Sequence, residues 1–295
     1  PASFFSPSGL LEDKMVAAIK ASQLSVDISI FTFESTLISQ ELAAARARGL
    51  KVRVIIDQKQ AKAFGKFTKW LAARDIKVYT LAGPNKDSDN PKAEKNHNKF
   101  GIFDGKLVET GSANYTKYAS KGNFENGHFL DHPTDVAAFQ FAFDHMVSVA
   151  KSVAVPEKAS ALPTDAHLEA AINRPVPVWT KPADNKPTLP KGRSFSFRGR
   201  HFPSIMLRPY DHAEEKIIEA LDAAQDQILV AAYELDLPGM LAALLRAKKR
   251  GVEIVILLDQ NHVYTSDYDE NRNPKMPSAE ILALIHKRFN VMTVS

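Results

Sequence analysis

The stretch NHNKFGIFDGKLVETGSANYT, residues 96–116, sets five polar side chains among apolar ones at fixed spacing, namely His97, Lys99, Asp104, Ser112 and Asn114. Two short apolar runs flank Asp104 and Gly105, a dipeptide typical of a tight hairpin turn. Alternate side chains of an extended strand share a face, so His97 and Lys99 are expected to point the same way. The stretch therefore predicts a hairpin that gathers an imidazole, an ammonium, a hydroxyl and a carboxamide.

This set of groups suits a phosphate ligand. Lys99 supplies positive charge, while Ser112 and Asn114 can donate hydrogen bonds to non-bridging oxygens. A histidine such as His97 can attack phosphorus or protonate a leaving oxygen. Gly111 is expected to let the backbone approach the ligand closely. We therefore take Lys99, Ser112 and Asn114 as candidate phosphate-binding residues.

The sequence on either side of this stretch alternates between strand and helix patterns. Strands are expected at 26–33, 51–57, 76–81 and 127–131, and helices at 9–22, 38–48, 66–74 and 133–149. The run KVRVIID (51–57) is apolar on both faces, as in a buried parallel strand. The alternation predicts an α/β architecture in which helices flank a mixed sheet.

A second copy of this pattern begins after residue 203. Gly49 and Gly251 are 202 positions apart, as are Asp57 and Asp259, and no gap is needed from Pro7 to Gln58. The strand pattern at 76–81 matches 289–294 at an offset of 213. This predicts an internal duplication. The partner of His97 would then fall beyond the sequence given, so we expect a second motif from a further C-terminal segment or, failing that, from a homodimer partner.

Between the two copies the composition changes. Prolines recur among basic residues, at positions 156, 163, 175, 177, 182, 187 and 190. We therefore expect a first domain at 1–155 with the intact motif, a Pro-rich basic linker at 156–203, and the N-terminal part of a second domain at 204–295. The segment KGRSFSFRGRH (191–201) mixes Arg with Phe, which fits either nucleic-acid contact or a solvated basic segment.

The composition narrows the possible chemistry. The 295 residues carry a net charge of +4, which favours an anionic partner. The chain has no cysteine, which excludes disulfides, thiolate nucleophiles and cysteine zinc sites. No apolar run approaches the ~20 residues that span a bilayer, so a soluble protein is expected. Its location stays open, with a weak preference for export.

The polar residues of the opening stretch follow the pattern His-x-Lys-(x)4-Asp-(x)6-Gly-Ser-x-Asn. This pattern resembles the signature of the phospholipase D superfamily. The local sequence is similar to that of its small endonuclease branch and of its cardiolipin hydrolase relatives. Glu125, in NFEN, stands where members of the family carry an acidic residue that orients the histidine. The resemblance covers residues 3–150 well, and residues 205–295 as a truncated second domain.

The resemblance implies two phospholipase D-like α/β/α domains related by a pseudo-twofold duplication, the second incomplete. It implies hydrolysis of a phosphodiester through a phosphohistidine, with no metal or cofactor. The candidate catalytic residues are His97, Lys99, Asp104 and Glu125. Beside the hairpin turn, Asp104 is equally suited to supporting the loop.

Three functions remain open at this point. The first is a metal-independent nuclease, which the basic charge favours. The second is a phospholipid hydrolase or transphosphatidylase, of the phospholipase D or cardiolipin synthase type, which would use the same residues. The third is a binding module without activity.

Overall fold

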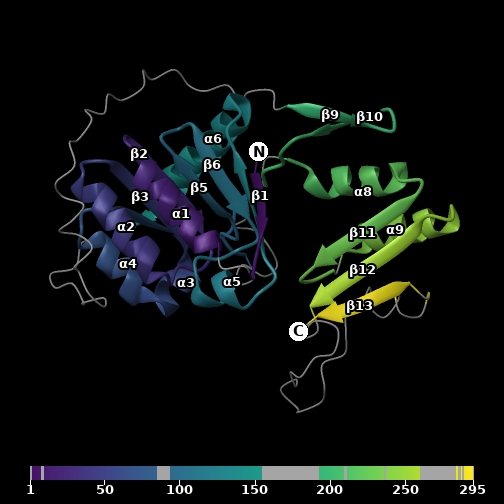
Figure 1. The fold of residues 1–295 in the computed structure, drawn as a ribbon, viewed down its shortest axis with the longest axis horizontal. Coiled ribbons are helices and arrows are strands. Elements are labelled where there is room, and N and C mark those ends of the chain that lie inside the picture. The colour runs from purple at the N-terminus through teal and green to yellow at the C-terminus, as the bar shows by residue number, and fades with distance from the viewer. Residues whose placement is uncertain are drawn as a thin grey trace, which may run out of the picture. The chain divides into compact units, whose positions relative to one another are not determined.

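The structure is a computed structural model that describes residues 2–7, 10–84, 94–154, 193–208, 211–235, 237–259, 284, 287 and 289–294. The chain divides into two compact units, Pro1–Arg193 and Ser194–Ser295. Each unit contains its own sheet (Figure 1).

The first unit is built on an eight-stranded mixed sheet, in the order β1-β7-β6-β5-β2-β3-β4-β8. Its strands are β1 Ala2–Phe5, β2 Ser25–Ile30, β3 Lys51–Asp57, β4 Lys77–Leu81, β5 Lys99–Phe103, β6 Leu107–Gly111, β7 Asn126–Leu130 and β8 Lys151–Ser152. Strands β2, β3 and β4 are parallel, and every other neighbouring pair is antiparallel. The expected mixed sheet is confirmed.

Helices cover both faces of this sheet. They are α1 Leu10–Ala21, α2 Thr36–Ala47, α3 Gln58–Ala63, α4 Gly65–Ala72, α5 Lys117–Lys121 and α6 Pro133–Val149. Phe100 of β5 packs against Phe139 and Phe143 of α6, with ring centroids 5.0 and 6.3 Å apart. The next residue, Gly101, faces Met15 of α1. Because neighbouring residues of a strand point to opposite faces, α6 lies on one face and α1 on the other (Figure 1).

The predicted hairpin is present as β5 and β6. Asp104 and Gly105 both have positive φ, 54° and 62°, as a two-residue type I′ turn requires. Lys106 N–H donates to Phe103 O at 2.9 Å and closes the turn. The turn brings Lys99 and Gly111, which lie at the two open ends of the hairpin, to the same end of the sheet.

The second unit has a smaller sheet, in the order β11-β12-β13, with all strands parallel. Its elements are the hairpin β9 Ser194–Phe197 and β10 Arg200–Pro203, then α8 Ala213–Ala223, β11 Gln227–Ala232, α9 Pro238–Lys249, β12 Glu253–Asp259 and β13 Asn290–Val294. Ser25 lies opposite Lys51 in the first unit, and Gln227 opposite Glu253 in the second. Both pairs keep the sequence offset of 202.

An arginine that donates to a carbonyl near a helix end repeats with the same offset. The Arg48 guanidinium donates to the carbonyl of Ile19 at 3.1 Å, and that of Arg250 donates to the carbonyl of Leu221 at 2.9 Å. Each arginine therefore ties the end of one helix to the end of the helix beside it, in the same way in both units.

The expected linker at 156–203 differs from the structure at its end. Residues 155–192 lie outside the described residues, but 194–203 form the β9–β10 hairpin of the second unit. The two strands pair antiparallel, and Phe195 and Phe197 pack against Phe202 at centroid distances of 5.7 and 6.4 Å. The sequence pattern also missed the short elements β1, β8, α3 and α5. In the part of the chain that the structure describes, no helix is both long and apolar enough to cross a bilayer.

Candidate active site

The motif residues other than Asp104 lie at the end of the first sheet that is formed by the carboxyl ends of its parallel strands. Lys99, the first residue of β5, pairs with Ile30, the last residue of β2. Asp57 is the last residue of β3, and Gly111 is the last of β6. The carboxyl edge of an α/β sheet is the usual place for ligand sites, because loops and helix N-termini converge there.

His97 and Lys99 are in direct contact, as their spacing predicted. The Lys99 Nζ lies 3.3 Å from His97 Nε2 and donates to the His97 carbonyl at 3.1 Å. The imidazole also packs edge-on against the ring of Phe31, with centroids 4.8 Å apart. Lys99 is 9% exposed, so its ammonium is held in place by packing, while His97 lies at the open rim.

The surroundings make His97 a neutral base. Desolvation is the main cause, and the charges of Lys99 and Lys95 add to it, while Asp57 opposes the effect; together they lower the pKa of His97 to about 4. Desolvation also lowers the pKa of Lys99 to about 8, against the pull of Glu125. At neutral pH the imidazole therefore keeps a free lone pair, while most Lys99 side chains remain charged.

We expect His97 to titrate near pH 4 in an NMR titration of its ring nitrogens. Replacing Lys99→Met should raise the pKa of His97 toward the ordinary 6.5, because the nearest positive charge is lost. Asp57→Asn should lower the pKa of His97 further, because a nearby negative charge is lost. A titration near 6.5 in the wild-type protein would contradict this electrostatic picture.

Asp57 is a site residue that the motif did not identify. Its carboxylate, 1% exposed, accepts the N–H of Asn96 at 3.0 Å through Oδ2, and the N–H groups of Lys59 and Gln60 through Oδ1. It thereby caps α3 and fixes the residue before His97. An acidic residue at the end of a buried parallel strand was the signal that could have pointed to it.

Ser112 and Glu125 form a bonded pair. The Ser112 hydroxyl donates to Glu125 Oε2 at 2.5 Å and accepts the N–H of Asn126 at 3.0 Å. The other carboxylate oxygen accepts from Asn123 at 3.0 Å. The structure thus connects Glu125 to Ser112, and its charge acts on Lys99. Its orientation of His97 and the phosphate contact of Ser112 stay predictions.

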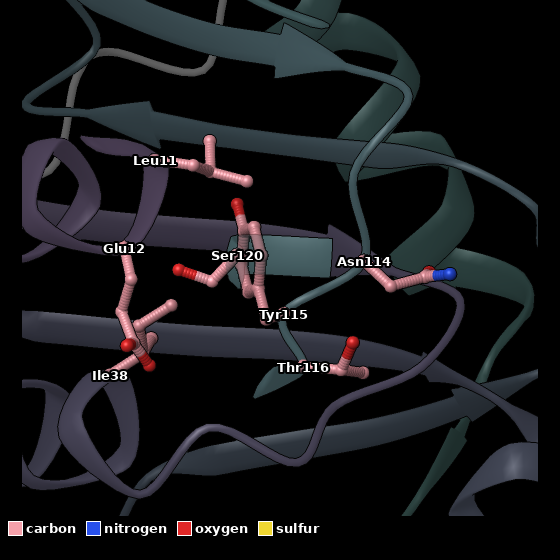
Figure 2. Close-up of a pocket in the computed structure, with 7 residues that line it drawn as sticks. All are labelled: Leu11, Glu12, Ile38, Asn114, Tyr115, Thr116 and Ser120. Atoms are coloured by element: carbon pink, nitrogen blue, oxygen red, sulfur yellow. The ribbon is translucent and has the colours of Figure 1, made fainter. Parts of the chain in front are cut away.

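Asn114 is oriented by the backbone at the end of β2. Its Oδ1 accepts the N–H of Thr32 at 3.2 Å, which leaves the amide NH2 as the donor. Figure 2 shows this amide turned away from a small pocket lined by Leu11, Glu12, Ile38, Tyr115, Thr116 and Ser120. Asn114 itself is among the residues that line this pocket, whereas His97 and Lys99 are not.

The contacts of Asp104 match the loop-supporting alternative, and its catalytic role stays a prediction. Its carboxylate accepts the backbone N–H groups of Gln23, Leu24 and Ser25, at 2.7–3.1 Å. It follows the last residue of β5, while Lys99 is the first, about 16 Å away along the strand. Asp104 therefore joins the hairpin turn to the start of β2, at the opposite end of the strands from Lys99.

Asp104→Asn is accordingly expected to lower stability and leave catalysis unchanged. Losing the charge and one of two acceptor oxygens should cost about 1–2 kcal/mol of unfolding free energy. Urea denaturation measures this loss, and kcat on a small phosphodiester should match that of the wild type. A large drop in kcat in a folded variant would instead support the catalytic role.

The expected role of Gly111 also needs correction. A Cβ on Gly111 would lie 2.0 Å from the carbonyl oxygen of Asn126. The close approach at this glycine is therefore to the backbone of β7, not to a ligand.

Among the described residues, no three His, Asp or Glu side chains form a cluster able to hold a metal ion.

The mixed sheet, with a His-x-Lys strand and a Gly-Ser-x-Asn turn meeting at one edge, defines a phospholipase D-like α/β domain. The chain belongs to the phospholipase D superfamily: the family model described as "Cardiolipin synthase, PLD-like domain" matches residues 15–147 and 217–293.

Curated relatives match part of the chain. The mitochondrial cardiolipin hydrolase of Chlamydomonas reinhardtii is 34% identical over 122 residues, which is 41% of this chain and 51% of that protein. The phospholipase D of Rickettsia prowazekii is 32% identical over 124 residues, 41% of this chain and 55% of that protein. The chain thus spans about half the length of the relatives it matches.

One solved structure shares the fold over most of the chain. The phosphatidylserine synthase of Haemophilus influenzae superposes with a TM-score of 0.57 at 11% identity, covering 92% of this chain and 64% of that one. At this identity the likeness concerns the fold alone.

Proposed function

We propose that the chain belongs to a metal-independent phosphodiesterase in which His97 is the nucleophile. The observation that carries the proposal is the contact of His97 Nε2 with Lys99 Nζ, 3.3 Å apart at the open edge of the sheet. The lowered pKa of His97 keeps its lone pair available, and Lys99 stands where charge on a phosphoryl group would need neutralising.

The reaction proceeds in two steps. His97 Nε2 attacks phosphorus, a phosphorus–nitrogen bond forms, and the bond to the leaving oxygen breaks. The leaving oxygen takes a proton from an acid on a second motif, and that group then removes a proton from the water that cleaves the phosphohistidine. Lys99 and the Asn114 amide stabilise the charge on the non-bridging oxygens.

We infer that the second motif belongs to a duplicated domain of which the second unit forms the first part. The shared strand register and the matching bonds of Arg48 and Arg250 support this inference. A further C-terminal segment would then supply the second His-x-Lys pair. A second copy of the chain is the less favoured source.

The substrate we favour is a nucleic acid, in keeping with the net charge of +4. A phospholipid is the second candidate, because the matched relatives are described as cardiolipin hydrolases and phospholipases D. Both substrates present the same phosphodiester to His97. A binding module without turnover is the outcome if no reaction occurs.

The test uses bis(p-nitrophenyl) phosphate in excess EDTA. Its leaving group departs without protonation, so His97 can react even where no second motif supplies an acid. We expect a stoichiometric burst of p-nitrophenolate and an acid-labile phosphoryl adduct on His97, detected by mass spectrometry. The absence of an adduct, or a reaction that stops with EDTA and returns with a divalent metal, would overturn the mechanism.

The substrate is then identified by incubation with labelled single- and double-stranded DNA, RNA and phospholipid vesicles, again in EDTA. Cleavage of nucleic acid supports the favoured substrate. Release of a lipid headgroup without nucleic-acid cleavage would replace it with the second candidate.

A further inference from the structure

Four exposed lysines line α3 and α4, and we call them the lysine track: Lys59, Lys62, Lys66 and Lys69. The segment from 58 to 74 contains five basic residues and no acidic one. Lys59 and Lys62 are three residues apart on α3, and Lys66 and Lys69 are three apart on α4, which is the spacing of neighbours on one helical face. Figure 1 places α3 and α4 in succession along the first unit.

The track has no internal counter-charge among the described residues. By contrast, Lys20 pairs with Glu41 and Lys77 with Asp75 in the same unit. No described carboxylate lies within ion-pair distance of a track lysine, and Lys66 only lies over the ring of Phe67, at 5.4 Å. The track is therefore a concentrated positive surface available to an external anion.

The track begins beside the candidate active site. One oxygen of Asp57 accepts the N–H of Lys59, and the other accepts the N–H of Asn96, the neighbour of His97. From Lys59 to Lys69, ten residues at the helical rise extend at most about 15 Å. That length covers two or three successive phosphates of one strand, which lie roughly 6–7 Å apart.

We propose that the lysine track binds the phosphates of a nucleic-acid strand that flank the phosphodiester held at His97. The proposal rests on the proposed function for the position of that phosphodiester, and it adds the surface that holds the rest of the substrate. Contacts to phosphates fix the position of a strand without reading its sequence, so binding is insensitive to base sequence.

The apolar residues of the same segment argue for a strand rather than a lipid surface. Ala61, Phe67, Trp70 and Leu71 are all buried in the core. Helices that lie on membranes combine basic residues with exposed apolar side chains that enter the lipid. No large apolar side chain between 58 and 72 is exposed in this way.

The test compares two triple variants that remove the same charge. The track variant is Lys62→Gln, Lys66→Gln and Lys69→Gln, which leaves the α3 cap at Lys59 intact. The control is Lys77→Gln, Lys106→Gln and Lys151→Gln, at exposed positions of the first unit outside α3 and α4. Fluorescence anisotropy with a labelled single-stranded oligonucleotide, from 50 to 300 mM NaCl, gives the affinity without requiring turnover.

We expect the track variant to bind at least about tenfold more weakly at 100 mM NaCl, with the slope of log K against log salt reduced by about 2, while the control stays close to wild type. Equal behaviour of the two variants overturns the proposal. So does a track variant that loses affinity only for vesicles of phosphatidylcholine and phosphatidylglycerol, which would assign the surface to lipid.

The assay separates this proposal from the proposed function. Failure of the phosphohistidine mechanism would appear as a missing burst with bis(p-nitrophenyl) phosphate in the wild-type protein. That small diester does not reach the track, so the track variant should give the wild-type burst. A track variant that loses the burst while remaining folded overturns the assignment of these lysines to strand binding.

Discussion

Replacing His97→Asn should abolish the reaction with phosphodiesters, with a loss of at least about 10⁴-fold in rate. Asparagine keeps a polar side chain of similar reach but has no lone pair able to form a phosphorus–nitrogen bond at useful rates. The remaining groups, Lys99 and Asn114, would still bind the phosphate. We therefore expect binding to persist while the burst with bis(p-nitrophenyl) phosphate and the phosphoryl adduct both disappear.

The matched control is His145→Asn, at an exposed position on α6. It removes one imidazole from the same unit and should leave the burst unchanged. If His97→Asn reacts as fast as the wild type, His97 has no part in the chemistry. If both variants lose the reaction, the loss reflects folding, and thermal denaturation of the two proteins would reveal it.

Glu109→Gln should stabilise the first unit at neutral pH by about 3 kcal/mol. Glu109 is 3% exposed and accepts a hydrogen bond from the Tyr115 hydroxyl at 3.3 Å. Burial raises the pKa of Glu109 to about 8, so the folded protein holds this proton at pH 7 whereas the unfolded chain, with the ordinary 4.5, does not. Glutamine is neutral in both the folded and the unfolded chain, so the variant takes up no proton at this position when it folds.

The sign of the pH dependence follows from the same shift. Between about 4.5 and 8 the folded state binds more protons than the unfolded state, so stability falls as pH rises through this window. Glu109→Gln should be nearly neutral at pH 4.5, and its advantage should grow up to pH 8.

Urea denaturation followed by tryptophan fluorescence at several pH values measures this difference, since Trp70 is fully buried in the first unit. Asp131→Asn, at an exposed acidic position, serves as the control and should show no such trend. A Glu109→Gln variant whose stability parallels the wild type from pH 4.5 to 8 would show that Glu109 ionises normally.

Much of the first unit was predictable, because its signals are local. The strand at 51–57 and the helix at 133–149 have the predicted bounds, since a run of β-branched residues and a helical apolar period need no partner to be recognised. Short elements such as α5 and β8 were missed, because a few residues carry too little pattern and depend on tertiary contacts. The β9–β10 hairpin was missed because its strands are only four residues long and lie in a segment whose composition resembles a basic linker.

The sequence alone determined the family, through six residues at fixed spacing, and it placed His97 beside Lys99, because side chains two apart on an extended chain share a face. Only the tertiary structure decided what each polar group does. In the folded chain Asp104 lies at the far end of β5 and accepts the N–H of Leu24. Ser112 donates to Glu125, and Asp57 accepts the N–H of Asn96, the residue before His97. Spacing fixes which neighbours share a face, but the pairing of strands distant in sequence fixes which side chains are buried and which charges meet, and these together set the pKa of His97.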